Sequence, residues 1–431
     1  MRIRRITARG AARAVRRFRE GISDEREVGE AVAAILDDVR ARGDEALFEA
    51  TRRFDGVDLS PRAAKVGDRE REEGWKSIGP ENRKAIRAAA RAIREYHRRC
   101  LPRGWTARNT DGVTVGERFY PLRRAGLYVP GGRVPLVSTV LMTAIPAQVA
   151  GVPGIAVCTP PQADGSVAGG LLGAFYYLGL REVYRVGGAQ AVGAMAFGTK
   201  TIPAVDLIAG PGNAYVTEAK RRLFGRVGVD LLPGPSEVMV IADGGADPAR
   251  VAGDLLAQAE HGTGKEKLYL TVPDQTFWKA VRRELEAGTE GLANGKTVAG
   301  ILADRLFAAV CEDEEAVVAL ANEIAPEHLE LQVAPPAVRA LTKRITTAGA
   351  ILQGYETATA LGDFVAGPSH TLPTDGTGRF SGGLQVGHFL RRSSLVRSTP
   401  AANRRALPAV EAFARMESLP AHADSLRRRV R

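Results

Sequence analysis

Four short apolar runs decide the fold of this chain: AGLYVPGG (residues 125–132), GIAVCTPP (154–161), EVYRVGG (182–188) and AVDLIAGPGN (204–213). Each run ends in glycine or proline. Small-residue stretches with helical spacing lie between them, for example Ser138 to Ala150 and Ala189 to Gly198. Strands that alternate with helices predict a largely parallel sheet, so the expected class is α/β.

The same alternation continues further along the chain, where four more runs are expected to be strands: VMVIADGG (238–245), KLYLTV (267–272), RLFAAV (305–310) and HLELQV (328–333). The first 110 residues are predicted to be mainly helical, because residues 27–42 and 81–99 carry apolar side chains at helical spacing. From about Leu384 the chain is rich in arginine and is again expected to be helical. A chain of 431 residues is too long for one ordinary core, so more than one domain is expected.

Composition is that of a soluble globular protein, with 45% hydrophobic and 25% charged residues. The net charge of +11 is scattered along the chain, which favours a solvated basic surface over a nucleic-acid site. No apolar run is long enough to span a membrane. The arginine-rich start, residues 1–21, lacks the apolar stretch of a secretory signal; it is expected to be a surface helix, with an organellar transit peptide as the alternative.

The three cysteines, Cys100, Cys158 and Cys311, are far apart and form no CxxC pair. An odd number of separated cysteines argues against a disulfide framework and against a thiolate metal site. The sequence therefore predicts a reducing compartment, the cytoplasm.

Residues 247–262, DPARVAGDLLAQAEHG, are predicted to form a helix with Asp247 as N-cap and Gly262 as C-terminal stop. Gln258 and His261 are three residues apart and would project from one face. An amide oxygen and an imidazole nitrogen so placed can bind one metal ion, and the alternative is a frayed helix end.

Residues 312–331, EDEEAVVALANEIAPEHLEL, are predicted to be a helix that Pro326 ends and a strand that follows it. Glu327 and His328 lie at this junction. A carboxylate beside an imidazole is a candidate pair for proton transfer.

Two further segments carry acid and imidazole groups. Asp363 and His370 fall in the glycine- and proline-rich loop of residues 361–380. Glu417 and His422 lie near the end of the chain, where a solvated tail is the alternative. The fingerprint GxGxxG is absent, so a dinucleotide would have to meet other backbone amides, such as those of residues 129–132 or 209–213.

Taken together, these segments resemble the histidinol dehydrogenase family over about residues 26–431. The motifs that carry the resemblance occur in the family's order: GLYVPGG, PAQVAGV, GGAQAVGAMAFG, GPGNAYV, GPSEVMVIAD, LLAQAEHG, NEIAPEHLEL, the GDF and SHTLPT loop, and the terminal AH run. The resemblance implies L-histidinol and NAD as substrates, one Zn²⁺ per subunit, and a homodimer with shared active sites.

The resemblance also implies a role for each matching position. It assigns Gln258, His261, Asp363 and His422 to zinc and to substrate, and Glu327 and His328 to acid/base catalysis. The remaining assignments are contacts with substrate (Ser236, His328, His370, Glu417) and with NAD (Tyr128, Gln190, Asn213). In the family the tail that bears Glu417 and His422 reaches into the partner's site.

The fold implied by the resemblance has two related, incomplete Rossmann-like domains with parallel-rich sheets. The first domain would comprise residues 26–127 and 238–383. The second domain, residues 128–237, would be inserted into the first and would contact NAD. Residues 1–25 would be an N-terminal helical extension and 384–431 a C-terminal helical tail.

The expected activity is the last step of histidine biosynthesis: histidinol is oxidised to histidine through a bound aldehyde. Three positions depart from the common family pattern, namely Pro233, the basic stretch from Thr263, and Ser369. An alternative is therefore a dehydrogenase of the same scaffold that acts on a sulfonated diol, for which Arg379 and Arg391 could bind the anion. A basic protein that binds nucleic acid without catalysis is the alternative from another class.

Overall fold

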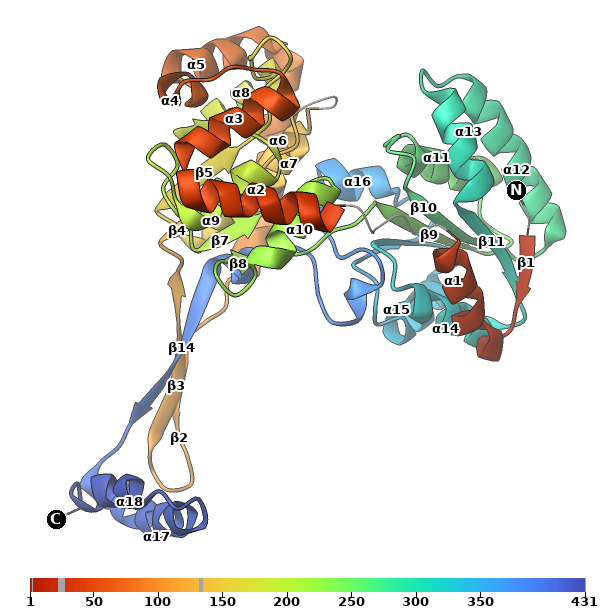
Figure 1. The fold of residues 1–431 in the computed structure, drawn as a ribbon. Coiled ribbons are helices and arrows are strands. Elements are labelled where there is room, and N and C mark those ends of the chain that lie inside the picture. Colours follow the sequence, from red (N-terminus) through yellow and green to blue (C-terminus); the bar gives the residue numbers. More distant parts are fainter. Residues whose placement is uncertain (2, 22–27, 132–134, 431) are drawn as a thin grey trace.

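The computed structural model describes residues 1, 3–21, 28–131 and 135–430. Two parallel sheets with helices on both faces lie side by side, and a long arm projects from the first of them (Figure 1). The α/β class with parallel-rich sheets is thus confirmed. None of the described helices has the length and apolar character that crossing a membrane requires.

The first sheet has five parallel strands in the order β6-β5-β4-β7-β8. Their bounds are β4 (Arg124–Tyr128), β5 (Gly154–Cys158), β6 (Glu182–Tyr184), β7 (Leu207–Ala209) and β8 (Gly228–Val229). One face packs against α5 (Asp68–Ser77), α6 (Gly79–Arg99), α7 (Val137–Ala150) and α8 (Gly169–Tyr177). The other face packs against α2 (Val28–Arg42), α3 (Asp44–Asp55), α9 (Gly188–Phe197) and α10 (Ala214–Leu223), and the short α4 (Pro61–Ala64) follows α3 in the chain.

The second sheet has six parallel strands in the order β1-β11-β10-β9-β12-β13. Their bounds are β1 (Ile3–Ile6), β9 (Glu237–Ala242), β10 (Lys267–Thr271), β11 (Leu306–Cys311), β12 (His328–Gln332) and β13 (Ala350–Gln353). One face packs against α11 (Pro248–Ala259), α12 (Gln275–Glu290) and α13 (Gly295–Asp304). The other packs against α1 (Ala11–Glu20), which follows η1 (Ala8–Gly10), and against α14 (Glu314–Ile324) and α15 (Pro335–Arg344).

The two sheets share one strand order. In chain order, strands β4 to β8 and strands β9 to β13 both run 3-2-1-4-5 across their sheets. In each, the order reverses beside the first strand, between β4 and β7 and between β9 and β12. This is the arrangement in which open parallel sheets place ligands at the reversal point.

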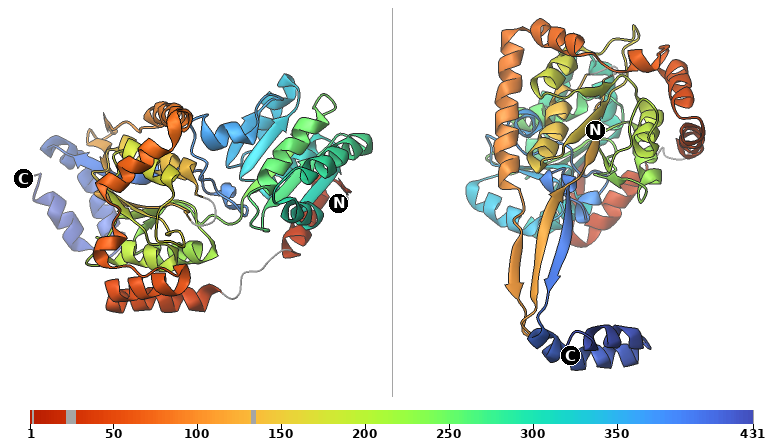
Figure 2. Two further views of the ribbon diagram at one scale, coloured as in Figure 1. Left: turned by 90° about the horizontal axis from the view of Figure 1, so that it is seen from above. Right: turned by 90° about the vertical axis from the view of Figure 1, so that its left-hand side faces the viewer.

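The arm is an antiparallel sheet of β14 (Leu390–Arg397), β3 (Thr114–Pro121) and β2 (Trp105–Arg108), with α17 (Pro400–Met416) and α18 (Pro420–Arg427) packed together at its far end (Figures 1 and 2). The expectation of helix from Leu384 onward is therefore wrong for β14, although α17 and α18 are helical. Strand β14 is largely exposed and pairs with residues almost 300 positions away, so its own sequence carries no periodic sign of burial.

The predicted helices and strands are otherwise found close to their expected ends. Residues 28–42 form α2 and residues 81–99 lie in α6, while residue 27 of the first predicted helix lies outside the described residues. All eight apolar runs contain strands. Of the predicted N-terminal surface helix, residues 11–20 are helical, but residues 3–6 form a strand that pairs with β11.

The segments also associate differently from the expected domain boundaries. The helices between residues 28 and 99 pack on the five-stranded sheet rather than with residues 238–383. Strand β1, expected within an extension, is an edge strand of the six-stranded sheet. An amphipathic helix shows that it has an apolar face, but its sequence does not show which sheet that face meets.

Candidate functional site

Glu327 and His328 lie at the start of β12, where a tight turn joins it to α14. The helix ends at Ile324, Ala325 takes a left-handed conformation (φ 46°), and Pro326 prevents the helix from continuing. Both side chains are buried, with exposed fractions of 6% for Glu327 and 5% for His328.

Three contacts orient this pair. The Glu237 N–H donates to Glu327 Oε2 at 2.8 Å. His328 Nε2 lies 3.3 Å from Asp363 Oδ1, and His328 Nδ1 lies 3.9 Å from Glu327 Oε2. The imidazole thus lies between two carboxyl groups from different elements, as a proton-transfer site requires.

The electrostatics of the pair follow from its burial and its neighbours. Burial raises the pKa of Glu327 to about 8. Burial opposes the charged form of His328, but the hydrogen bond with Asp363 and the negative charges of Glu327 and Asp363 outweigh it, so the pKa of His328 is raised to about 9. Both groups therefore titrate near the pH range in which a side chain can act as acid and base.

Gln258 and His261 lie beside this pair, at the end of α11. Asp247 caps the helix by accepting from Ala249 N–H, as predicted. The helix ends at Ala259, so His261 lies in the following turn rather than on the helix face that was expected. Gln258 Nε2 is nevertheless 3.2 Å from His261 Nδ1.

The donor set fits a metal ion in part. Asp363 ends the short helix α16 (Thr359–Phe364), and burial opposes the charge of its carboxyl, but the hydrogen bond with His328 and the charges of His370 and His261 keep its pKa lowered. Within the described ranges, no three His, Cys, Asp or Glu side chains converge on one point suited to a metal ion. An amide donor such as Gln258 is outside those residue types.

His370 connects the loop after α16 to the five-stranded sheet. Its Nδ1 lies 2.9 Å from the Asp363 carbonyl oxygen and its Nε2 lies 3.3 Å from Thr139 Oγ1, in the first turn of α7. Ser236, the residue before β9, lies next to Glu237 in the chain. The contacts from Thr139 through His370 to Asp363 and His328 therefore link the two sheets.

The site residues come from opposite edges of the two sheets. Thr139 lies in α7, which follows β4. Glu327, His328 and Ser236, by contrast, stand at the starts of β12 and β9. The carboxyl edge of one sheet thus meets the amino edge of the other.

Glu417 and His422 are not brought to this place within the chain. Both are exposed residues of the helices at the far end of the arm (Figure 1). The view from above in Figure 2 shows the same separation between the arm's terminal helices and α16.

Tyr128, Gln190 and Asn213 lie at the carboxyl edge of the five-stranded sheet. Tyr128 ends β4, and its Oη accepts from Gly188 N–H at 3.1 Å, at the start of α9. Gln190 is buried in the first turn of α9, and its Nε2 has no hydrogen-bond partner among the described residues. Asn213 caps α10 through Oδ1, which accepts from the Tyr215 and Val216 N–H groups.

Sequence reasoning missed two contributors. Thr139 gave no signal beyond its position in a helix of small residues. Glu237 lies within the quoted GPSE motif, and it is a fully buried carboxyl at the head of an apolar strand. A charged residue before a run such as VMVIA is a pattern that could have identified it.

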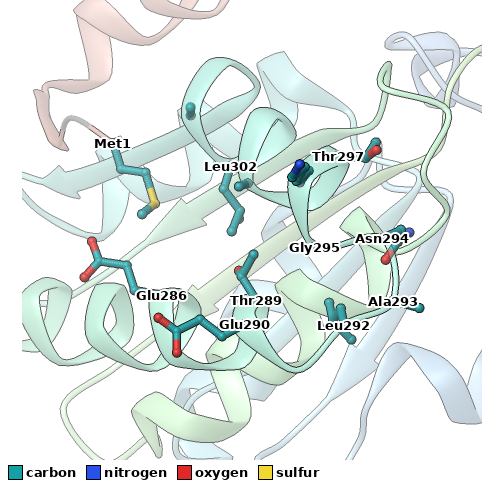
Figure 3. A pocket seen from close by; sticks show the side chains of 13 residues that line it. Met1, Glu286, Thr289, Glu290, Leu292, Ala293, Asn294, Gly295, Thr297 and Leu302 are labelled. Carbon is teal, nitrogen blue, oxygen red and sulfur yellow. The ribbon is translucent and has the colours of Figure 1, made fainter.

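A surface hollow of about 850 Å³ lies elsewhere, between α12 and α13 (Figure 3). Glu286 and Glu290 line it together with Met1, Leu292 and Leu302. None of the predicted site residues is among the residues that line it.

The chain is similar to known proteins over nearly its whole length. Residues 19–430 match the family model described as histidinol dehydrogenase. A histidinol dehydrogenase of Cereibacter sphaeroides is 47% identical over 94% of this chain and 93% of its own length, and one of Geobacillus kaustophilus is 43% identical over 99% and 98%.

Two solved structures are also similar. The histidinol dehydrogenase of Elizabethkingia anophelis has a TM-score of 0.91 and 33% identity, with 96% of both chains covered. An acetylating aldehyde dehydrogenase from Geobacillus thermoglucosidasius has a TM-score of 0.50 and 15% identity, covering 91% of this chain and 98% of that one. The second likeness concerns the fold alone.

Proposed function

Because this chain belongs to the histidinol dehydrogenase family, we propose that it oxidises L-histidinol to L-histidine through a bound aldehyde, with reduction of two NAD. The observation that carries the proposal is the buried Glu327–His328 pair beside Asp363, in a chain that matches its relatives almost from end to end. Histidinol is a primary alcohol, so a base and a hydride acceptor are the chemical requirements.

In the first oxidation His328 takes the proton of the alcohol. Its Nε2 faces the site, whereas its Nδ1 is directed to the main chain of Glu237 at 3.4 Å. NAD, when bound, accepts the hydride from the carbon that bears the hydroxyl group. The alcohol thereby becomes an aldehyde.

In the second oxidation Glu327 activates the water that adds to the aldehyde. A carboxylate whose pKa is raised to about 8 by burial is a stronger base than an ordinary one, so it can assist this addition. His328 returns its proton to the aldehyde oxygen as the water adds, and it then takes the proton of the resulting diol as hydride leaves to a second NAD. One site performs both steps because the reacting carbon stays in the same position.

Gln258, His261 and Asp363 would hold a divalent cation, proposed to be zinc, with His422 supplied by a second copy. This set fits a cation because the side chains of Gln258 and His261 already contact each other. Asp363 interacts with the charge of His261. The cation supplies a positive centre that binds and orients the substrate nitrogens. Oxygen and nitrogen donors of this kind are suitable for zinc with an open coordination position.

The assembly we propose is a homodimer with shared active sites, and the remote position of Glu417 and His422 supports it (Figure 1). Tyr128, Gln190 and Asn213 would contact NAD. All three cysteines are free thiols, which suits the proposed cytoplasmic location.

The sulfonated-diol alternative is not favoured. It requires a cationic side chain in the pocket, and neither candidate is placed there. Arg379 is exposed and donates through Nε to the Gly376 carbonyl oxygen. Arg391 lies on β14 of the arm, over the ring of Tyr120.

The test is to supply L-histidinol and NAD and to count NADH formed per histidine. The expected ratio is two, without release of free aldehyde. A ratio of one, or turnover of a sulfonated diol in preference to histidinol, would contradict the proposal.

A further inference from the structure

The main chain of one buried residue, Glu237, contacts both members of the acid/base pair. Its N–H donates to Glu327 Oε2 at 2.8 Å, and its carbonyl oxygen lies 3.4 Å from His328 Nδ1. Glu237 begins β9, which pairs directly with β12, so His328 lies opposite Val238 in the register. A single residue of the neighbouring strand therefore orients both side chains.

This contact has a chemical consequence for His328. The charged ring can donate from Nδ1 to the Glu237 carbonyl oxygen and from Nε2 to Asp363. When the ring becomes neutral and Nδ1 keeps its bond to the carbonyl oxygen, the proton that leaves is the one on Nε2, and the lone pair is then at Nε2. Nε2 is the nitrogen that faces Asp363, at 3.3 Å. A base with its lone pair on the opposite nitrogen could not accept the proton of a bound alcohol.

The side chain of Glu237 is held by a buried lysine. Lys267 lies opposite Glu237 in the β9–β10 register, and its Nζ lies 3.1 Å from Glu237 Oε1. The Glu237 carboxyl is fully buried and the Lys267 side chain is only 8% exposed. Lys267 also forms a hydrogen-bonded ion pair with Asp375, in the loop that follows His370.

The same loop contacts the segment that leads into β9. Gly234 N–H donates to Thr374 Oγ1 at 2.6 Å. A Cβ at Gly234 would lie 2.0 Å from Asp375 Oδ2, so a larger residue there would displace the carboxylate that pairs with Lys267. The main chain on both sides of Ser236 is thus fixed, on one side by the loop and on the other by Lys267.

A buried ion pair gives little net stability, because the cost of removing two charges from water offsets their attraction. The role of the ion pair here is to orient the main chain of Glu237. We propose that Lys267 and the carboxylate of Glu237 are positioning residues, which fix the Glu237 main chain so that the Glu327 carboxyl and Nε2 of His328 face the substrate. The role in turnover rests on the proposed function, whereas the orientation of the ring does not.

The experiment uses Lys267→Met in the full-length enzyme, with Glu237→Gln as a second, isosteric variant in case the first folds poorly. We expect kcat to fall about 10- to 100-fold, the scale of a small misplacement of reacting groups, while KM for histidinol changes less than about twofold. The matched control is Arg124→Met. It breaks a partly buried ion pair, with Glu182, at the edge of the five-stranded sheet opposite Tyr128.

The second readout is the ring tautomer of His328, from ¹H–¹⁵N spectra of protein labelled in its histidine rings, assigned with His328→Asn. The spectra are recorded above pH 9, where the ring of His328 is neutral. The Nδ1-protonated form is expected there in the wild type and in Arg124→Met, and a mixture of tautomers in Lys267→Met and Glu237→Gln. If both variants keep the wild-type tautomer and kcat and lose only thermal stability, the pair is merely structural and the proposal is overturned. If the wild type fails to oxidise histidinol, the proposed function fails, and the ring spectra still test the positioning.

Discussion

His97 is predicted to make this protein sensitive to mild acid. It lies on α6 with an exposed fraction of 0%, and neither ring nitrogen has a hydrogen-bond partner among the described residues. Its ring packs edge-on against Tyr96, with centroids 5.2 Å apart. Burial lowers its pKa from 6.5 to about 4, since a charged imidazole there would have lost its water.

The sign and size of the effect follow from this shift. The folded pKa of His97 is depressed, so the unfolded chain binds the proton more readily. The associated stability is present above pH 6.5 and is lost as the pH falls from there toward 4. The full pKa shift of His97 corresponds to about 3.4 kcal/mol in the free energy of unfolding. Between pH 7 and pH 5 the free energy of unfolding falls by about 2 kcal/mol.

The assay is urea unfolding at pH 7 and pH 5, at one protein concentration, for the wild type and His97→Leu. Between the two pH values, we expect the free energy of unfolding of the wild type to fall by about 2 kcal/mol more than that of the variant. His388→Gln, which removes a half-buried histidine, is the matched control and should keep the wild-type loss. Equal losses in the wild type and His97→Leu would refute the reasoning.

Three further outcomes concern the site. Chelation is expected to abolish NAD reduction and a divalent ion to restore it; full activity in protein shown by elemental analysis to be metal-free would contradict the metal site. His328→Asn is expected to slow both oxidations about 10²- to 10⁴-fold, whereas Glu327→Gln slows mainly the aldehyde step, and single-turnover rates with each substrate distinguish them. Equal losses in both steps for Glu327→Gln would argue against the assigned roles. Mixing His422→Ala and His328→Asn chains should restore about one active site in four, because half the dimers are mixed and each then has one intact site; no recovery would count against shared sites.

Local sequence determined the regular elements and the reactive groups. Apolar runs between glycine-rich turns predicted the strands, and Asp247 and Pro326 marked helix ends where the structure has them. The quoted motifs identified Glu327, His328 and Asp363, which the structure brings together. Such features are local, since strand burial, capping and helix termination depend on a few neighbouring residues.

Tertiary structure alone decided which sheet each segment joined and how the groups were oriented. Strands β1 and β14 escaped prediction because edge and exposed strands pair with distant residues and carry little apolar periodicity. The role of Glu237 was hidden for a related reason. Its contacts with Glu327 and His328 are made by main-chain atoms, which every residue possesses, so only the register of β9 and β12 reveals them.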